Sequence, residues 1–251
     1  MFFTKVLQRL FYCKIGYAIL VLVFSLPVYA LQDQESDIAW YESFFQEGKR
    51  NTVENALSKA NSKLNQAVKQ QDQIAEAMAL KEIALIHLTR TFNYDSAIKF
   101  LVQALAIEDL LQRKDKLVFT YLAIAQVFEK VGNYPKGTEY LKLALLLNES
   151  QHNRAVDALI LNELGKINAS KGQVEEAFEN YQLVLVYRDE IKRPKVDAEA
   201  LFNLAHLYTM QGKYNEALQN HKLALAIRRS INDKKNEAQS LNDIGELYGL
   251  M

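Results

Sequence analysis

The chain has 251 residues, and its 30 basic and 30 acidic residues give a formal net charge of zero. This balance leaves no basic field of the kind that nucleic-acid-binding domains carry, so we expect no nucleic-acid partner. The only cysteine, Cys13, precedes the apolar core of an N-terminal segment. The rest of the chain can therefore form neither a disulfide nor a thiolate metal site.

Residues 1–30 have the pattern of a secretory signal peptide. Their charged residues are all basic, an apolar core runs from Tyr17 to Phe24, and a small-x-small cleavage pattern ends at Ala30. A retained membrane anchor is the alternative, because Ile15–Leu31 is nearly long enough to span a bilayer when tilted. We predict cleavage after Ala30 and an exported chain, periplasmic or membrane-anchored and facing the periplasm. Membrane contact is expected only through residues 1–30 or a segment beyond residue 251.

Residues 31–51 are expected to cap the N-terminal end of a helical array that occupies residues 52–251. Their loop-like start is followed by crowded aromatic residues, among which Trp40 is expected to pack rather than to bind a ligand. Val53 and Ala60 then belong to a degenerate helical pattern, whose polar character is typical of a terminal repeat.

Amphipathic helical patterns follow one another along this array. The first clear one is Glu76–Leu88, after which TRTFNY replaces the glycine that separates the later helices and one extra residue is expected before Tyr94. Pro135 is assigned to the first turn of a helix, where its missing N–H has no consequence, and Pro194 to a loop between repeats. Helix hairpins are predicted at Val118–Leu147, Asp157–Tyr187 and Asp197–Arg228.

A spacing of forty residues relates these hairpins. Gly132, Gly172 and Gly212 recur at this spacing, each where a helix end needs a residue that adopts the left-handed conformation without strain. A fixed period in the range of 20–50 residues is the signature of a solenoid. Other repeat positions hold small or aromatic residues where helices are expected to meet, among them Gly165, Tyr214, Ala217 and Gly245.

The run formed by Ala205, Tyr208, Gly212, Tyr214 and Ala217 resembles the tetratricopeptide repeat (TPR) family. The resemblance extends from about residue 52 to the end of the chain. It implies an all-α, right-handed superhelical solenoid of stacked antiparallel helix hairpins. The usual TPR is about 34 residues long, so the additional residues of this period are expected to lengthen the helices.

The C-terminal residues form the first helix of a further hairpin, whose second helix does not follow in this sequence. Solenoids carry polar caps at their ends, so Ile244, Leu247 and Tyr248 are expected to expose an apolar stripe. This pattern predicts self-association through the open end. It also favours the hypothesis that the chain is part of a longer protein.

Motifs of catalysis are absent from the sequence. There is no phosphate-binding glycine loop, no zinc-protease motif and no nucleophile elbow, so we predict no catalytic residue, no cofactor and no enzymatic activity. Any catalytic domain would lie beyond residue 251. None of His87, His152, His206 and His221 has a metal-ligand partner at i+3 or i+4, and no metal site is predicted.

In proteins that the chain resembles, the first helix of each hairpin lines a concave face that binds a partner. On these helices, the positions not used for packing carry amides, charges of both signs and a few apolar groups. Lys81 is expected on the same face of its helix. Asn and Gln can pair with a backbone amide as donor and acceptor at once. The alternative is an ordinary solvated helix face. The candidate partner-binding residues are Gln126, Lys130, Asn162, Glu163, Lys166, Phe202, Asn203, His206, Asn242 and Asp243.

Two functions follow from the resemblance, and both rest on binding a protein or peptide segment. The first is the exported sensory or interaction region of a larger bacterial signalling protein, of the histidine kinase or diguanylate cyclase type. The second is a self-standing periplasmic interaction scaffold or assembly adaptor. A set of lysine, arginine and asparagine positions like the carboxylate clamp of chaperone-binding TPRs cannot be assembled from this sequence.

Overall fold

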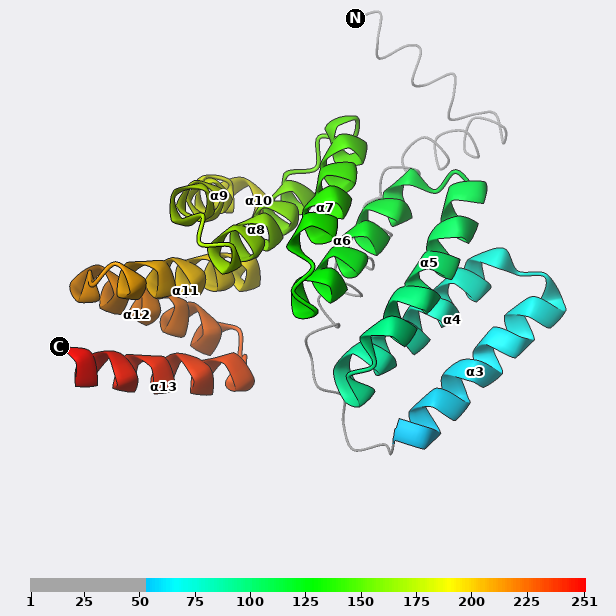
Figure 1. Cartoon of the computed structure of the whole chain (residues 1–251), viewed down its shortest axis with the longest axis horizontal. Helices are drawn as coiled ribbons and strands as arrows, with labels where there is room; N and C mark the ends of the chain where they lie inside the picture. The colour runs from blue at the N-terminus through cyan, green and yellow to red at the C-terminus, as the bar shows by residue number, and fades with distance from the viewer. Residues whose placement is uncertain (1–52) are drawn as a thin grey trace, which may run out of the picture. The chain divides into compact units, whose positions relative to one another are not determined.

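A computed structural model describes residues 53–251, and every regular element in this part of the chain is helical (Figure 1). The predictions for residues 1–30 and 31–51, including the packing of Trp40, lie outside the described residues. Within residues 53–251 no helix combines the length and the apolar character that crossing a bilayer requires. The elements are α3 (Val53–Gln70), α4 (Gln73–Ile86), the π-helical turn η1 (His87–Thr91), α5 (Tyr94–Leu110), α6 (Lys114–Lys130), α7 (Tyr134–Glu149), α8 (Arg154–Ser170), α9 (Val174–Val186), α10 (Arg188–Ile191), α11 (Pro194–Met210), α12 (Tyr214–Ser230) and α13 (Lys234–Leu250).

Consecutive helices pack in pairs, and the pairs stack on one another. The hairpins are α4–α5, α6–α7, α8–α9 and α11–α12, and the second helix of each also packs against the first helix of the next. The helices α6, α8, α11 and α13 begin at Lys114, Arg154, Pro194 and Lys234, each forty residues after the one before. This is the predicted all-α, right-handed solenoid of antiparallel hairpins, in which each repeat contacts its neighbours.

The three glycines at the forty-residue spacing end the first helices as expected. Gly132, Gly172 and Gly212 have φ angles of +74°, +75° and +72°, in the left-handed region that only glycine enters without steric strain. In the α4–α5 hairpin Phe92 takes this position with a φ of +52°. The sequence TRTFNY therefore makes the same turn without a glycine.

The π-helical turn η1 explains why the α4–α5 hairpin departs from the common spacing. From Gln73 to Lys114, the starts of α4 and α6, the chain advances by 41 residues rather than forty. A π-helical turn accommodates one residue more than an α-helical turn. The extra residue therefore lies in His87–Thr91, and the next helix resumes the common register at Tyr94.

The two prolines lie at helix starts. Pro135 is in the first turn of α7, as expected. The prediction of a loop at Pro194 is wrong, because Pro194 is the first residue of α11. A proline is favourable there because the first N–H groups of a helix have no intrahelical acceptor and because its φ angle already suits the helix.

Ala217 and Gly165 lie at close helix contacts, as expected, but the prediction of such a contact at Gly245 is wrong, because Gly245 is exposed. Ala217 is completely buried. A Cβ atom added to Gly165 would overlap the ring of Tyr181, with Cζ and Cδ1 at 2.7 and 2.8 Å, whereas a Cβ on Gly245 would meet nothing within 4 Å. The absence of a side chain at position 165 therefore makes room for an aromatic ring, and Gly245 has no such neighbour among the described residues.

The expected apolar stripe on the last helix is only partly correct. Ile244 and Leu247 are buried, with exposed fractions of 9% and 2%. Both positions belong to the face of α13 that packs against α12. Tyr248 is exposed, as are Leu241 and Leu250.

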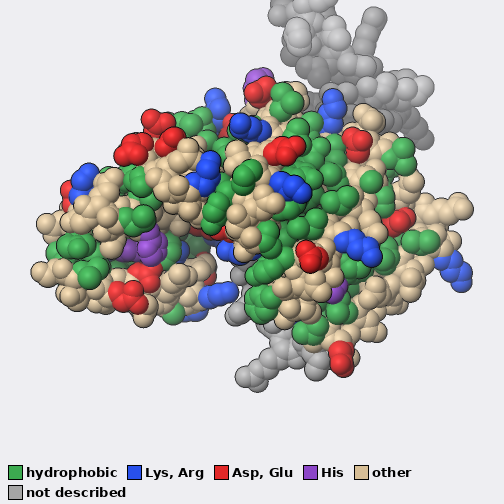
Figure 2. Space-filling model, in the orientation of Figure 1, with side chains coloured by type: hydrophobic (Ala, Val, Ile, Leu, Met, Phe, Trp, Pro, Cys, Tyr) green, Lys and Arg blue, Asp and Glu red, His purple; other side chains and the backbone are tan. Residues whose placement is uncertain are grey.

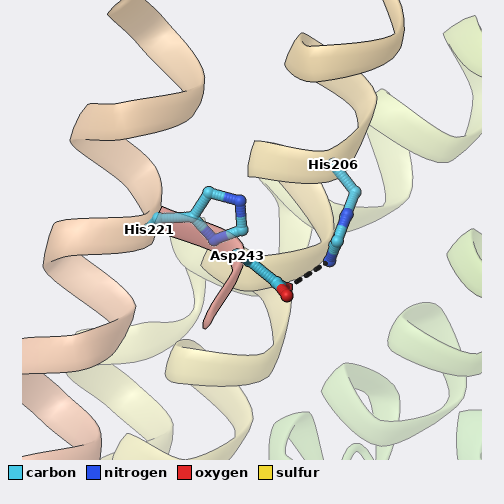
Figure 3. Close-up of side chains that lie close together, drawn as sticks. All are labelled: His206, His221 and Asp243. Atoms are coloured by element: carbon cyan, nitrogen blue, oxygen red, sulfur yellow. Dashed lines mark ion pairs between the residues drawn. The ribbon is translucent and has the colours of Figure 1, made fainter. Parts of the chain in front are cut away.

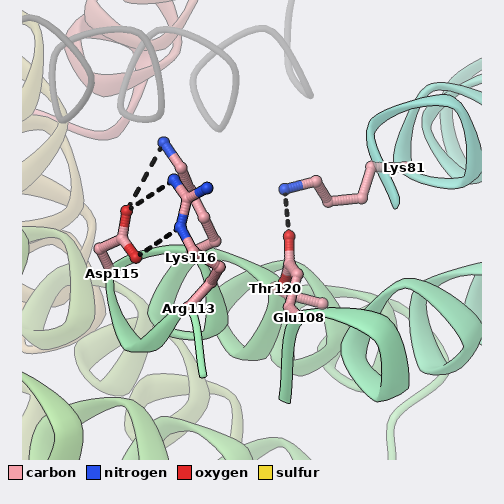
Figure 4. Close-up of polar contacts among 6 residues, drawn as sticks. All are labelled: Lys81, Glu108, Arg113, Asp115, Lys116 and Thr120. Carbon is pink, nitrogen blue, oxygen red and sulfur yellow. Dashed lines mark hydrogen bonds and ion pairs between the residues drawn. The ribbon is translucent and has the colours of Figure 1, made fainter. Parts of the chain in front are cut away.

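A buried ion pair connects the first hairpins (Figure 4). Lys81 Nζ on α4 lies 2.6 Å from Glu108 Oε1 at the end of α5, and Thr120 on α6 donates a 2.6 Å hydrogen bond to the other oxygen of Glu108. The prediction that Lys81 lies on the partner-binding face is wrong, because the side chain is buried. Nearby, burial raises the pKa of Asp115, but Arg113 and Lys116 together hold it below its ordinary value.

Later repeats use the same place for other polar contacts. Asn148, forty residues after Glu108, donates a 2.7 Å hydrogen bond to Asp157 on the following helix. Arg228, another eighty residues on, donates to Ser240 Oγ at 2.6 Å and to the carbonyl oxygen of Asn236. The end of each of these second helices is therefore tied to the next repeat by a different side chain.

Candidate functional site

The ten candidate partner-binding residues lie on the first helices α6, α8, α11 and α13, and we call their common surface the first-helix face. Their exposure differs widely. Gln126, Asn162, Glu163 and Phe202 are buried, with exposed fractions of 2%, 2%, 4% and 7%. Lys166, Asn203 and Asp243 are half-buried, and Lys130, His206 and Asn242 are exposed. The buried members can shape this face, but only the others offer side chains to a partner.

The centre of the first-helix face is a polar contact between α8 and α11. Asn203 donates a hydrogen bond of 3.4 Å to the side-chain oxygen of Asn162. One turn along α8, Lys166 Nζ contacts both carboxylate oxygens of Glu163 at 2.9 and 3.0 Å. The predicted patch of Asn162, Lys166 and Asn203 therefore exists, with Glu163 as its buried counter-ion.

Several carboxylates surround Lys166. Burial alone would lower the pKa of Lys166, but Glu163, Glu199 and Glu129 raise it well above its usual range. Burial raises the pKa of Glu199, and repulsion from Glu163 adds to the increase, against the attraction of Lys166. Burial and the same three carboxylates also raise the pKa of Tyr181. The lysine is consequently charged, and its charge offsets the buried carboxylate of Glu163 and the half-buried carboxylates of Glu199 and Glu129.

Three residues from three helices meet at the C-terminal end of the described chain (Figure 3). His206 is on α11, His221 on α12 and Asp243 on α13, and one ligand atom of each lies within 4.8 Å of the others. His206 Nε2 is 3.1 Å from Asp243 Oδ2. In the space-filling view, histidine side chains are visible beside acidic ones over this end of the molecule (Figure 2).

The two histidines are packed around Phe202. The ring of His206 lies 4.6 Å and that of His221 5.3 Å from the Phe202 ring, both edge to face, and Arg228 lies 4.1 Å over it. Burial, and then the neighbouring His206 ring, lower the pKa of His221 to about 4. His221 is therefore neutral at pH 7 and keeps a lone pair on one ring nitrogen.

Sequence reasoning missed the grouping of the histidines with Asp243. Spacings of i+3 and i+4 indicate ligands on one helix, whereas His206, His221 and Asp243 are separated by 15 and 22 residues. It also missed Glu199, which acts on Lys166, and Tyr181, which lies against Gly165, because both approach α8 only after α9 and α11 pack on it. The forty-residue register carried a usable signal, because His206, His221 and Asp243 are the counterparts of Lys166, Tyr181 and Asn203.

The comparisons with known proteins agree with this architecture. Residues 197–251 match the family model described as tetratricopeptide repeat. No curated protein matches the chain. The TPR-like fold is generally a scaffold that binds proteins.

Solved structures share the fold at low sequence identity. The crystal structure of BtubC (BKLC) from P. vanneervenii matches with a TM-score of 0.67 and 20% identity, over 80% of this chain and 85% of that one. The crystal structure of nearly identical TPR-like repeats of a putative kinesin light chain from Podosopora anserina matches with a TM-score of 0.55 and 17% identity, over 80% and 96%. Residues 197–251 therefore carry the sequence pattern of the tetratricopeptide repeat family, and the described helices have the fold of TPR-like repeat structures.

Proposed function

We propose that this chain is a scaffold that binds an extended protein or peptide segment on its first-helix face, centred on Asn203 and Lys166. The observation that carries the proposal is the contact between Asn203 and Asn162, which places a half-buried carboxamide beside a charged lysine at the junction of two repeats. A carboxamide can donate to and accept from one peptide unit. An extended segment is the ligand that such a group recognises through its backbone.

The neighbouring residues favour a partner that contacts both repeats. Asn162 and Glu163 are buried and hold Asn203 and Lys166 in place, so that these two side chains are positioned before a partner arrives. Ordering long side chains on binding reduces affinity, and a prearranged lysine avoids part of that loss. His206, one turn beyond Asn203 on α11, extends the accessible part of the face toward α13.

A library of linear peptides displayed on phage tests this proposal without a known partner. Peptides enriched on the purified full chain are measured by fluorescence polarisation against the native protein and three variants. Asn203→Ala is expected to weaken binding several-fold, because loss of one such hydrogen bond removes about 0.5–1.5 kcal/mol. Lys166→Ala is expected to weaken binding as well, whereas Glu216→Ala, exposed on the outer helix α12, leaves it unchanged.

The proposal is contradicted if Asn203→Ala and Lys166→Ala bind these peptides as tightly as the native chain does. Circular dichroism melts of both variants are required, because Lys166 balances buried carboxylates. If Lys166→Ala loses its fold, its loss of binding is not informative. Asn203→Ala, whose stability is expected to change little, then decides the question.

The cellular setting is a further part of the proposal. The signal-like residues 1–30 support an exported chain, and the layout of such a segment followed by TPRs supports the sensory or interaction region of a larger bacterial signalling protein. The alternative is a self-standing periplasmic scaffold or assembly adaptor. A fusion of the whole chain to alkaline phosphatase, which is active only after export, tests the localisation; an inactive fusion contradicts it.

A further inference from the structure

We propose that His206, His221 and Asp243 bind a divalent transition-metal ion, such as zinc, that links the three helices of the C-terminal repeat. This role goes beyond peptide binding and uses side chains from α11, α12 and α13, whose ligand atoms all lie within 4.8 Å of one another.

Two of the three groups are buried without a hydrogen-bond partner. Nδ1 of His221 and Oδ2 of Asp243 are both inaccessible to solvent and have no hydrogen-bond partner within the described residues. Asp243 Oδ2 lies 3.1 Å from His206 Nε2, a contact that is an ion pair only when His206 is protonated. A buried polar atom without a partner is unfavourable, and such atoms are rare in native proteins. One ion between these groups would satisfy both.

The chemistry of the donors selects the kind of ion. Two imidazole nitrogens and one carboxylate oxygen suit zinc and the neighbouring divalent transition metals, whereas magnesium and calcium prefer oxygen ligands alone. Zinc binds such ligands at about 2.0–2.2 Å, so the three atoms must move closer together. His206 can supply that movement, because 49% of its side chain is exposed. The same exposure leaves room for water as a fourth ligand.

The nearest cation does not occupy the place of the ion. Arg228 lies over the ring of Phe202 and is held by Ser240 and by the carbonyl oxygen of Asn236. Its guanidinium is thus engaged with Asn236 and Ser240 of α13, which precede Asp243 by about two turns and by less than one turn, respectively. The carboxylate of Asp243 faces the two histidines (Figure 3).

The repeat architecture provides an internal comparison for this site. The same three helix positions hold Lys166, Tyr181 and Asn203 one repeat earlier, and Gln126, Leu141 and Glu163 two repeats earlier. Neither of these earlier sets contains two strong transition-metal ligands. The fold therefore brings the three positions together in successive repeats, and only the last repeat that the structure describes fills them with a histidine pair and a carboxylate.

The test is a titration of the purified full chain with Zn²⁺ after treatment with a chelator, followed by calorimetry. We expect one ion per chain. His206→Ala and the isosteric Asp243→Asn should each weaken binding at least as much as the roughly 10–100-fold that loss of an outer-shell partner causes. His152→Asn is the matched control, since His152 is an exposed histidine in a left-handed turn that asparagine tolerates.

Two further readouts separate a built site from surface binding. Co²⁺ should give visible d–d bands in the native chain that are lost in Asp243→Asn, and Zn²⁺ should raise the melting temperature of the native chain but not of His206→Ala. The proposal is overturned if the native chain binds no Zn²⁺, or if Asp243→Asn binds it as tightly as the native chain does. His221→Gln is a third variant, at a buried position. If it fails to fold, His206→Ala and the isosteric Asp243→Asn still test the proposal. No peptide is involved, so the result is independent of the proposed partner binding.

Discussion

Two successive repeats place different chemistry on the same three helix positions. Lys166, Tyr181 and Asn203 lie where α8, α9 and α11 meet, and the polar groups of Lys166 and Asn203 are engaged by Glu163 and Asn162. One repeat later, at the junction of α11, α12 and α13, the corresponding polar atoms of His221 and Asp243 have no hydrogen-bond partner among the described residues. In the first region the internal contacts hold Lys166 and Asn203 in place on the first-helix face, whereas in the second region buried polar atoms lack a hydrogen-bond partner. The TPR-like fold thus determines where three side chains come together, and the residue types determine which contacts or ligands they can form.

A fourth position changes together with these three. In the earlier repeat Gly165 lies against the ring of Tyr181, which would overlap any Cβ atom there. In the later repeat the counterparts are Ala205 and His221, both buried. A larger ring is accompanied by a glycine, and a smaller ring by an alanine. This pairing indicates that the two positions share one volume between the helices of each hairpin.

The largest effect is expected from Gly165→Ala. Its new methyl group would overlap a completely buried Tyr181 ring that cannot move aside, and overpacking of this kind destabilises proteins by about 1–3 kcal/mol. The higher helix propensity of alanine offsets part of that loss. Urea denaturation followed by circular dichroism should show a clearly lower midpoint than the native chain. An unchanged midpoint would mean that the contact between α8 and α9 is looser than described.

The double variant Gly165→Ala/Tyr181→His installs the pair of the later repeat in the earlier one. Tyr181→His alone leaves a void and should destabilise, but the added methyl group fills part of that space. We expect the double variant to be more stable than the sum of the single effects by about 0.5–3 kcal/mol, the range for residues in contact. Urea midpoints of all four proteins complete the cycle. If the effects of the two single substitutions on the free energy of unfolding simply add, positions 165 and 181 do not share one volume.

The helices and their turns were largely predictable from the sequence, because their signals are local. Glycines at a fixed period and amphipathic patterns placed the hairpins, and only details such as Pro194 at the start of α11 and the π-helical turn at His87–Thr91 differed. A proline after charged residues fits a loop and a helix start equally well. The extra residue was expected before Tyr94, where TRTFNY replaces the glycine turn, but the sequence does not specify that a π-helical turn accommodates it.

The sites were less predictable, because they depend on which helices meet. Lys81 lies on the expected helix, yet its partner Glu108 is 27 residues away on another helix and draws it into the interior. The candidate residues Gln126 and Phe202 are likewise buried. The position of a residue on a helix predicts the side to which its side chain points, but the exposure of that side chain also depends on the adjoining repeat. The distance between His206 and Asp243 required the stacking of two repeats as well.

A smaller effect, of opposite sign, is expected from Gly245→Ala. Gly245 is the counterpart of Gly165 in α13, but its Cβ would meet no atom within 4 Å. Replacement then changes only the backbone entropy and helix propensity, and should stabilise the protein by roughly 0.5–1 kcal/mol. The urea midpoint should rise slightly. The same substitution would thus act in opposite directions at equivalent positions, and a decrease at Gly245 would contradict the open surroundings described for it.

The smallest expected effect concerns pH. Burial, followed by repulsion from Glu163, raises the pKa of Glu199 above its ordinary value of 4.5, and the attraction of Lys166, Lys195 and Arg228 does not fully compensate. The native state therefore holds this proton to a higher pH than the unfolded state does. The corresponding stability is present at acid pH and is lost as the pH rises through the raised pKa. The later repeat has Gln239 at this position. Glu199→Gln copies that residue and should remove this one group's contribution to the pH dependence, so that the free energy of unfolding, measured in urea from about pH 4.5 to 7, falls less steeply than in the native chain. An identical slope in both proteins would show that Glu199 titrates as it does in water and that the carboxylates around Lys166 are less buried than described.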